Sequence, residues 1–152
     1  MIACRLTQAA YAAALQGTGA FYAGGRWNTK GSSILYCAAS RSLALCEVLV
    51  HLPKLELHQR SFAFSVIEFP EDSFVSAPPL PPDWHQYPYS PAAQAIGDGF
   101  LQQAKHLALR VPSALVPSEW IFGLNPNHRR NREIRLLSVE PFVLDHRFFQ
   151  RP

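Results

Sequence analysis

The chain has 152 residues, a formal net charge of +3 and a hydrophobic fraction of 48%. This length suits one domain, and the apolar content can fill a core, which excludes disorder as a description of the whole chain. No run of about 18 apolar residues is free of charge and proline, and no secretory signal follows Met1. We therefore expect no membrane span and a cytoplasmic location.

The three cysteines form no CxxC pair, and the six histidines show no spacing typical of metal ligands. We interpret the thiols as small buried side chains in a reducing compartment, at Cys4, Cys37 and Cys46. Neither a disulfide framework nor a metal site is predicted.

The first third of the chain predicts two short strands and two helices around a glycine-rich loop. Thr7 and Ser40 are the expected N-caps, and the loop holds five of the eight glycines. The predicted elements are a strand over 2–6, an alanine-rich helix ending at Gly17, the loop over 17–31, a strand over 34–37 and a helix over 41–51.

The second of these helices contains a single acidic side chain in apolar surroundings. Seven of the eight residues over 43–50 are apolar, a pattern typical of a helix buried on all sides. Glu47 is the exception. A carboxylate there costs several kcal/mol unless it is solvated in a cleft, paired or protonated. Glu47 is therefore a candidate functional residue.

The rest of the chain predicts a long irregular segment between regular elements. Residues 70–91 hold seven of the 13 prolines, and we expect a loop without regular structure. The other predicted elements are strands over 60–69, 111–116, 120–124 and 134–139 and a helix over 92–109. This order indicates an α+β fold, a single domain over 1–152 with a mixed or antiparallel sheet and flanking helices.

A basic cluster lies near the end of the chain. Its arginines, at 129, 130, 132 and 135, suit phosphate contacts, but such a run is more often a solvated loop or a surface for an acidic partner.

Four polar residues in apolar surroundings form a candidate site. Arg26 lies in the glycine-rich loop, Tyr36 ends a buried strand, and Ser113 follows another strand. Arginine suits a phosphate, tyrosine can stack on a flat ring, and a carboxylate such as Glu47 can stabilise positive charge on a sugar carbon. The structural alternative is an Arg26–Glu47 ion pair beside a core tyrosine and a turn serine.

Several strings, in order, resemble the RES domain family. They include GGRWN at Gly24–Asn28, LALCEVLVH at Leu43–His51, VPS at Val111–Ser113 and NP at Asn125–Pro126. One departure is Ile121, where relatives commonly carry asparagine.

The resemblance implies a bacterial type II toxin with a fold similar to ADP-ribosyltransferases, NAD+ as its substrate and no metal. It implies an Xre-type helix-turn-helix antitoxin that carries the DNA-binding function, and it leaves self-association within that complex open. The resemblance assigns catalytic roles to Arg26, Tyr36 and Glu47. Substrate binding also involves Arg5, Asn28 and Ser113.

The resulting hypothesis is cleavage of the nicotinamide–ribose bond of NAD+. Arg26 and Ser113 would hold the diphosphate with Arg5 in support, Tyr36 would orient nicotinamide, and Glu47 would stabilise the transition state. Water, phosphate or a protein side chain would accept the ADP-ribosyl group, so mono-ADP-ribosylation of a protein is the alternative. A more distant alternative is a non-catalytic basic interaction module.

Overall fold

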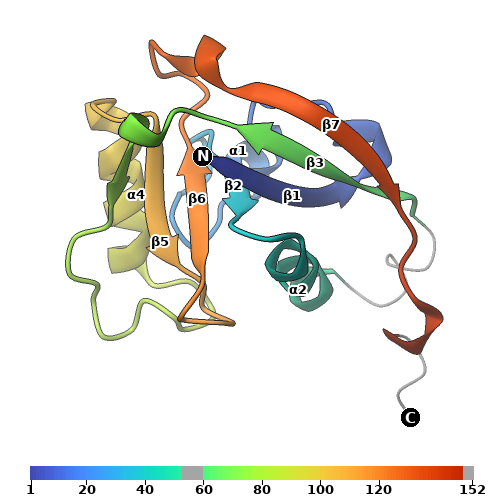
Figure 1. Ribbon diagram of the computed structural model, residues 1–152. Helices are drawn as coiled ribbons and strands as arrows, with labels where there is room; N and C mark the ends of the chain where they lie inside the picture. Colours follow the sequence, from blue (N-terminus) through green and yellow to red (C-terminus); the bar gives the residue numbers. More distant parts are fainter. Residues whose placement is uncertain (53–59, 149–152) are drawn as a thin grey trace.

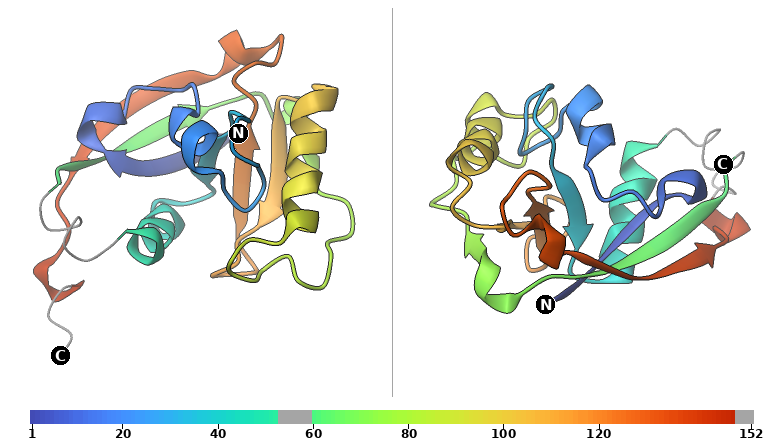
Figure 2. Two further views of the ribbon diagram at one scale, coloured as in Figure 1. Left: turned by 180° about the vertical axis from the view of Figure 1, so that it is seen from behind. Right: turned by 90° about the horizontal axis from the view of Figure 1, so that it is seen from above.

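The computed structural model describes residues 1–52 and 60–148. In this part of the chain, seven strands form one mixed sheet, and three helices gather on the same side of it (Figures 1 and 2). The expected α+β single domain is confirmed. No helix in these ranges has the length and apolar character needed to cross a bilayer.

The sheet has the order β4-β5-β6-β2-β1-β3-β7, and only the β4–β5 pair is parallel. The strands are β1 (Ile2–Gln8), β2 (Leu35–Ala38), β3 (Phe62–Glu68), β4 (Phe74–Ser76), β5 (Ala108–Pro112), β6 (Trp120–Leu124) and β7 (Arg135–Phe142). The helices are α1 (Thr18–Ala23), α2 (Arg41–His51) and α4 (Pro91–Gln103).

The two halves of the sheet diverge at its centre. β1 pairs with β3 over seven residues but with β2 only at Cys4↔Ala38. In Figure 1, β5 and β6 run steeply across the direction of β1, β3 and β7. A sheet that separates in this way leaves space between β1 and β2, and α2 packs against these two strands.

Buried side chains on the two faces of the sheet form two apolar clusters. One contains Leu43 of α2, Phe100 of α4 and inward residues of β1, β3 and β5. The other contains Phe69 and Phe122, whose rings pack edge to face at 5.3 Å. β3 contributes Phe62 and Phe64 to the first cluster and Ile67 to the second, which explains its near-continuous burial.

The early part of the chain differs from the prediction in two places. No α-helix forms between Thr7 and Gly17: β1 continues to Gln8 because its backbone stays paired with β3 up to Phe62, and a short 3-10 turn follows. The segment 17–31 is not entirely a loop, since it begins with α1.

The proline-rich segment also contains regular structure. Residues 74–76 form β4, which pairs in parallel with β5, so the irregular part shrinks to 77–90. α4 begins at Pro91 because the Ser90 hydroxyl accepts a hydrogen bond from the Ala93 amide. It ends at Gln103, since Ala104 adopts a left-handed conformation with φ 47°, and β5 starts earlier than predicted.

α2 has the predicted bounds but is not buried on all sides. Only Leu43 and Ala44 are buried, whereas Val50 is 58% exposed and Cys46 is exposed. A helix that packs on one face of a sheet turns its other face outward, whatever side chains it carries. The expectation of three buried thiols is therefore wrong for Cys46.

Candidate functional site

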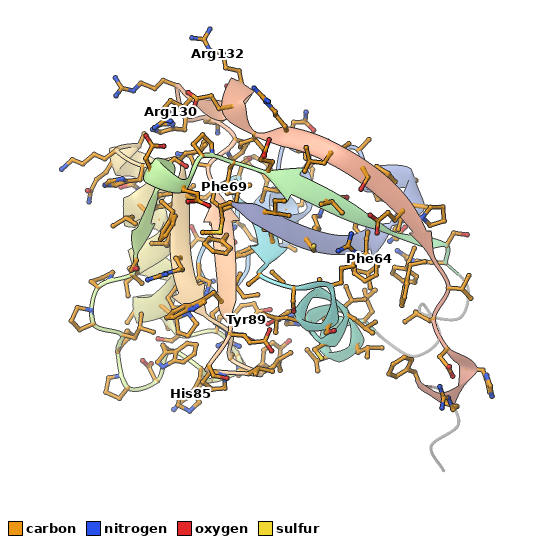
Figure 3. All side chains as sticks on the ribbon, viewed as in Figure 1. Phe64, Phe69, His85, Tyr89, Arg130 and Arg132 are labelled. Atoms are coloured by element: carbon orange, nitrogen blue, oxygen red, sulfur yellow. The ribbon has the colours of Figure 1, made fainter. Side chains whose placement is uncertain are left out.

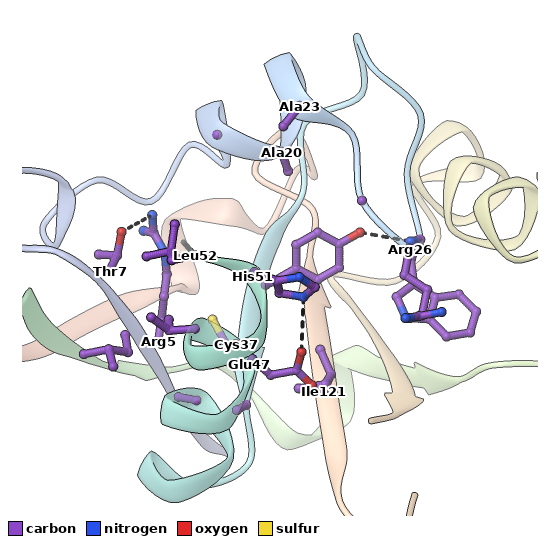
Figure 4. A pocket seen from close by; sticks show the side chains of 18 of the residues that line it. Arg5, Thr7, Ala20, Ala23, Arg26, Cys37, Glu47, His51, Leu52 and Ile121 are labelled. Carbon is purple, nitrogen blue, oxygen red and sulfur yellow. Dashed lines mark hydrogen bonds and ion pairs between the residues drawn. The ribbon is translucent and has the colours of Figure 1, made fainter. Parts of the chain in front are cut away.

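A cavity of about 530 Å³ lies where β1 and β2 diverge. Its walls come from these two strands, α1 with the glycine-rich loop, α2 and the segment that contains Tyr87 and Tyr89. In the view of Figure 4, Arg5 lies on one side of Glu47 and His51, and Arg26 lies on the other. The structure thus brings together four residues that are up to 46 positions apart in the sequence.

The Glu47 carboxylate is held in place by a hydrogen bond from Ser113. The Ser113 hydroxyl donates a 2.9 Å hydrogen bond to Glu47 Oε1 and accepts from the amides of Leu115 and Val116. Because these two amides occupy the acceptor side of the hydroxyl, its proton is directed at the carboxylate. Glu47 keeps 27% of its side chain exposed, so this carboxylate is both oriented and accessible.

His51 lies one helical turn beyond Glu47 and faces the same cavity. Its Nε2 is 3.6 Å from Glu47 Oε2, and its side chain is 47% exposed. Residues four apart on a helix share a face. Its imidazole is therefore close enough to influence how the carboxylate interacts with a ligand.

Arg26 is held by the main chain of a distant segment. Its Nη1 donates to the carbonyl oxygens of Trp84 and Gln86, both at 2.8 Å, and its guanidinium lies 5.2 Å from the centre of the Tyr89 ring. Among the described residues, no ion pair joins Arg26 to Glu47 or to another carboxylate, so the structural ion-pair alternative is wrong.

The hydroxyl of Tyr36 is fixed by two hydrogen bonds. Its hydroxyl donates to Asn28 Oδ1 at 2.7 Å and accepts from the Trp27 amide at 3.1 Å. Burial raises the pKa of Tyr36 well above its usual range, so the phenol stays neutral. Gly25 is required here because a Cβ would lie 2.9 Å from both the Tyr36 hydroxyl oxygen and Asn28 Oδ1.

Arg5 contributes a second guanidinium to the cavity wall. Its Nη1 donates to the Ala14 carbonyl at 2.9 Å, and its Nη2 lies 3.4 Å from Thr7 Oγ1. Burial lowers the pKa of Arg5, and within residues 1–52 and 60–148 no carboxylate forms an ion pair with it. The cavity therefore carries positive charge at two places that the described acidic residues do not neutralise.

The predicted site residues divide into two groups. Arg5, Arg26, Tyr36 and Glu47 line the cavity, whereas Asn28 and Ser113 are almost fully buried behind its wall. Sequence reasoning missed His51, Tyr87 and Tyr89. The four-residue spacing from Glu47 was a usable signal for His51, but nothing local indicates that the proline-rich segment reaches Arg26. Ile121 also lines the cavity.

The basic cluster at 129–135 lies at a different end of the molecule from Tyr89 (Figure 3). Arg130 pairs with Asp72 at 3.1 Å and with Glu133 at 2.9 Å, and Arg135 lies 4.0 Å from Glu68. Among the described residues, no group of three or more His, Cys, Asp or Glu is arranged to hold a metal ion.

Known proteins share both the fold and the family of this chain. The fold matches a chain in the crystal structure of the Mycobacterium tuberculosis MbcT–MbcA toxin–antitoxin complex, with a TM-score of 0.76 over 93% of this chain and 84% of that chain. Sequence identity is 19%, so this match shows the fold. The RES domain model then matches residues 2–145. The chain belongs to the RES domain family.

Its similar relatives are named as toxins. "Toxin Res" of Photorhabdus laumondii is 40% identical over 129 residues, 83% of this chain and 82% of the relative. "Toxin Res" of Pseudomonas putida is 36% identical, covering 89% and 92%. "Prs ADP-ribosylating toxin" of a Sphingobium species is 33% identical, covering 90% and 88%. The resemblance inferred from the sequence strings is confirmed.

Proposed function

We propose that this chain is the toxin of a toxin–antitoxin system and that it cleaves the nicotinamide–ribose bond of NAD+. The observation that carries the proposal is a serine-oriented carboxylate, Glu47, in a cavity where two guanidiniums have no carboxylate partner among the described residues. Its volume of about 530 Å³ lies within the range of small-molecule sites, roughly 300–1,000 Å³.

The charges of NAD+ complement those of the cavity. Its diphosphate is the group that a guanidinium binds best, since the planar fork donates two parallel hydrogen bonds. We assign the diphosphate to Arg26, whose position is fixed by two carbonyls, and a supporting role to Arg5. Neutralising the unpaired guanidiniums would contribute to the binding free energy.

Bond cleavage then depends on Glu47. As the bond from ribose C1′ to the pyridinium nitrogen breaks, its electron pair goes to nicotinamide, which leaves as a neutral molecule and needs no strong acid. The sugar becomes cationic, and the nearby carboxylate stabilises that charge. Water attacks C1′ and loses a proton, and we assign its acceptance to Glu47.

The remaining residues position these groups. Tyr36 presents its ring to the cavity while Asn28 holds its hydroxyl, which suits stacking on nicotinamide. We assign Ser113 to orienting Glu47 instead of binding phosphate, because its hydroxyl already contacts the carboxylate. His51 would tune the same carboxylate from the next turn of α2.

Transfer to a protein is the second candidate reaction, and the name of the Sphingobium relative favours it. It uses the same cleavage step with a protein side chain in place of water. The MbcT–MbcA complex supports an antitoxin as the partner. From the resemblance of the sequence to the RES family, we propose that this partner is of the Xre type.

The test is release of nicotinamide from NAD+ by the chain made in a cell-free system. We expect Glu47→Gln to lower the rate by about 100-fold or more, the scale seen when one electrostatic group is removed from an active site. Glu71→Gln, on a carboxylate 80% exposed outside the cavity, is the matched control. Equal rates for wild type and Glu47→Gln would refute the proposed function. Mass spectrometry of proteins from a cell extract incubated with the chain and NAD+ would separate transfer from hydrolysis.

A further inference from the structure

The segment Trp84–Tyr89, which we call the strap, lies beside Arg26 and contributes Tyr87 and Tyr89 to the lining of the cavity. Besides the two carbonyls that accept from Arg26, the strap is anchored by the Trp84 ring, which stacks on the buried Trp27 ring at 6.0 Å and 24°. The strap and the loop that carries Arg26 therefore hold each other in place. Any group bound to the Arg26 guanidinium would lie next to the strap.

Two tyrosines of the strap line the cavity. The Tyr89 ring lies against the Arg26 guanidinium, and the Tyr87 ring meets Tyr89 edge to face at 5.4 Å and 88°. Tyr87 is nevertheless 78% exposed. Such exposure means that its ring contributes little to the core, so an apolar face remains open at the rim of the cavity.

We propose that Tyr87 forms the binding site for the adenine ring of the substrate. The inference rests on the proposed function for its starting point. With the nicotinamide ribose at Glu47 and the diphosphate at Arg26, the next group along the dinucleotide is adenosine. Adenosine then extends past Arg26, where the strap lies. A base stacks well on an aromatic side chain, because both offer a flat π face.

The order of groups along NAD+ distinguishes this assignment from a nicotinamide site at Tyr87. Nicotinamide is joined directly to the ribose that the proposed function places at Glu47, and Tyr36 is a further aromatic ring in the cavity wall. The adenine is separated from this ribose by the diphosphate and a second ribose. A tyrosine at the rim beside the diphosphate ligand therefore fits adenine.

The experiment is calorimetric titration of the full-length Glu47→Gln chain with ADP and with nicotinamide mononucleotide. ADP carries adenine without nicotinamide, and the mononucleotide carries nicotinamide without adenine. We expect Tyr87→Ala to weaken ADP binding by about 5- to 100-fold, the range for loss of one base–aromatic stack, and to leave the mononucleotide unaffected. Tyr87→Phe, which keeps the ring, should bind ADP like the parent.

Tyr22→Ala is the matched control. Tyr22 is 72% exposed and packs against Phe21 at 5.2 Å, but it does not line the cavity. ADP affinity that Tyr87→Ala leaves unchanged, or no ADP binding at all, would overturn the inference. Equal weakening of both ligands would overturn it too, because Tyr87 would then act through Arg26. If ADP binding depends on Tyr87 while the wild type releases no nicotinamide, the adenine site stands and the cleavage proposal fails.

Discussion

Arginine side chains in two regions of the molecule are held in opposite ways. In the cavity, Arg5 and Arg26 donate to main-chain carbonyls, and the described residues give them no carboxylate. In the basic cluster, Arg130 donates to the carboxylates of Asp72 and Glu133. A carbonyl fixes the position of a guanidinium but leaves its full charge, whereas a carboxylate fixes it and neutralises it.

This difference shows why the density of arginines in the sequence is a poor guide to ligand binding. The 129–135 cluster is the most basic stretch in the chain, yet the ion pairs of Arg130 and Arg135 explain much of it as structural. Arg26 lies in a glycine-rich loop that also carries Lys30. The fold places it, like Arg5, beside a cavity and gives it no carboxylate partner among the described residues.

The largest expected effect compares one arginine from each region. Arg26→Gln should lower kcat/KM for nicotinamide release by about 100-fold, because it removes a charge-assisted contact to the diphosphate. Arg130→Gln should leave kcat/KM within about twofold. Initial rates at several NAD+ concentrations measure both. A loss of activity in Arg130→Gln as large as that in Arg26→Gln, with both variants folded, would contradict the comparison.

Two glycines of α4 allow a test of how closely this helix packs against Trp27. A Cβ on Gly97 would overlap the Trp27 carbonyl oxygen, whereas one on Gly99 meets nothing within 4 Å. Gly97→Ala should therefore lower the free energy of unfolding by about 1–3 kcal/mol or more through overpacking. Gly99→Ala should raise it by about 0.5–1 kcal/mol through helix propensity. Urea unfolding measures both, and equal stabilities would show that α4 can move away from Trp27.

The sequence was informative where one local pattern decides the outcome. The Ser40 cap and the apolar run gave the bounds of α2, and the alternation after Arg60 gave β3. The sequence did not predict the strands whose extent depends on pairing with a distant strand. β1 extends to Gln8 because β3 supplies its partners, and β4 forms because β5 lies beside it. Local preference cannot report such partners.

In the candidate site, too, the sequence predicted the residue types but not the contacts between distant segments. Residue type and the resemblance to the RES family selected Glu47, Arg26 and Tyr36, and the structure gathers them around one cavity. Sequence alone could not show that Ser113 faces Glu47 across 66 positions. Nor could it show that the carbonyls of the strap hold Arg26, since a carbonyl carries no signature in the residue type.

The smallest expected effect lies in the acid stability of the basic cluster. The hydrogen bond and charge of Arg130 hold the pKa of Glu133 below its ordinary value of 4.5. A carboxylate with a lowered folded-state pKa stabilises the fold fully above its unfolded-state pKa, and this stabilisation is lost as pH falls through the folded-state pKa. Arg130→Gln should therefore lower Tm at pH 7, and the Tm difference from wild type should shrink below about pH 4.5.

Arg129→Gln, which removes a neighbouring cation instead, is the control. Its Tm difference from wild type, measured by thermal unfolding followed by circular dichroism, should be smaller and should change less with pH. A Tm difference for Arg130→Gln that stays constant between pH 7 and pH 3 would show that Arg130 does not neutralise Glu133, and the contrast with the cavity arginines would then rest on geometry alone.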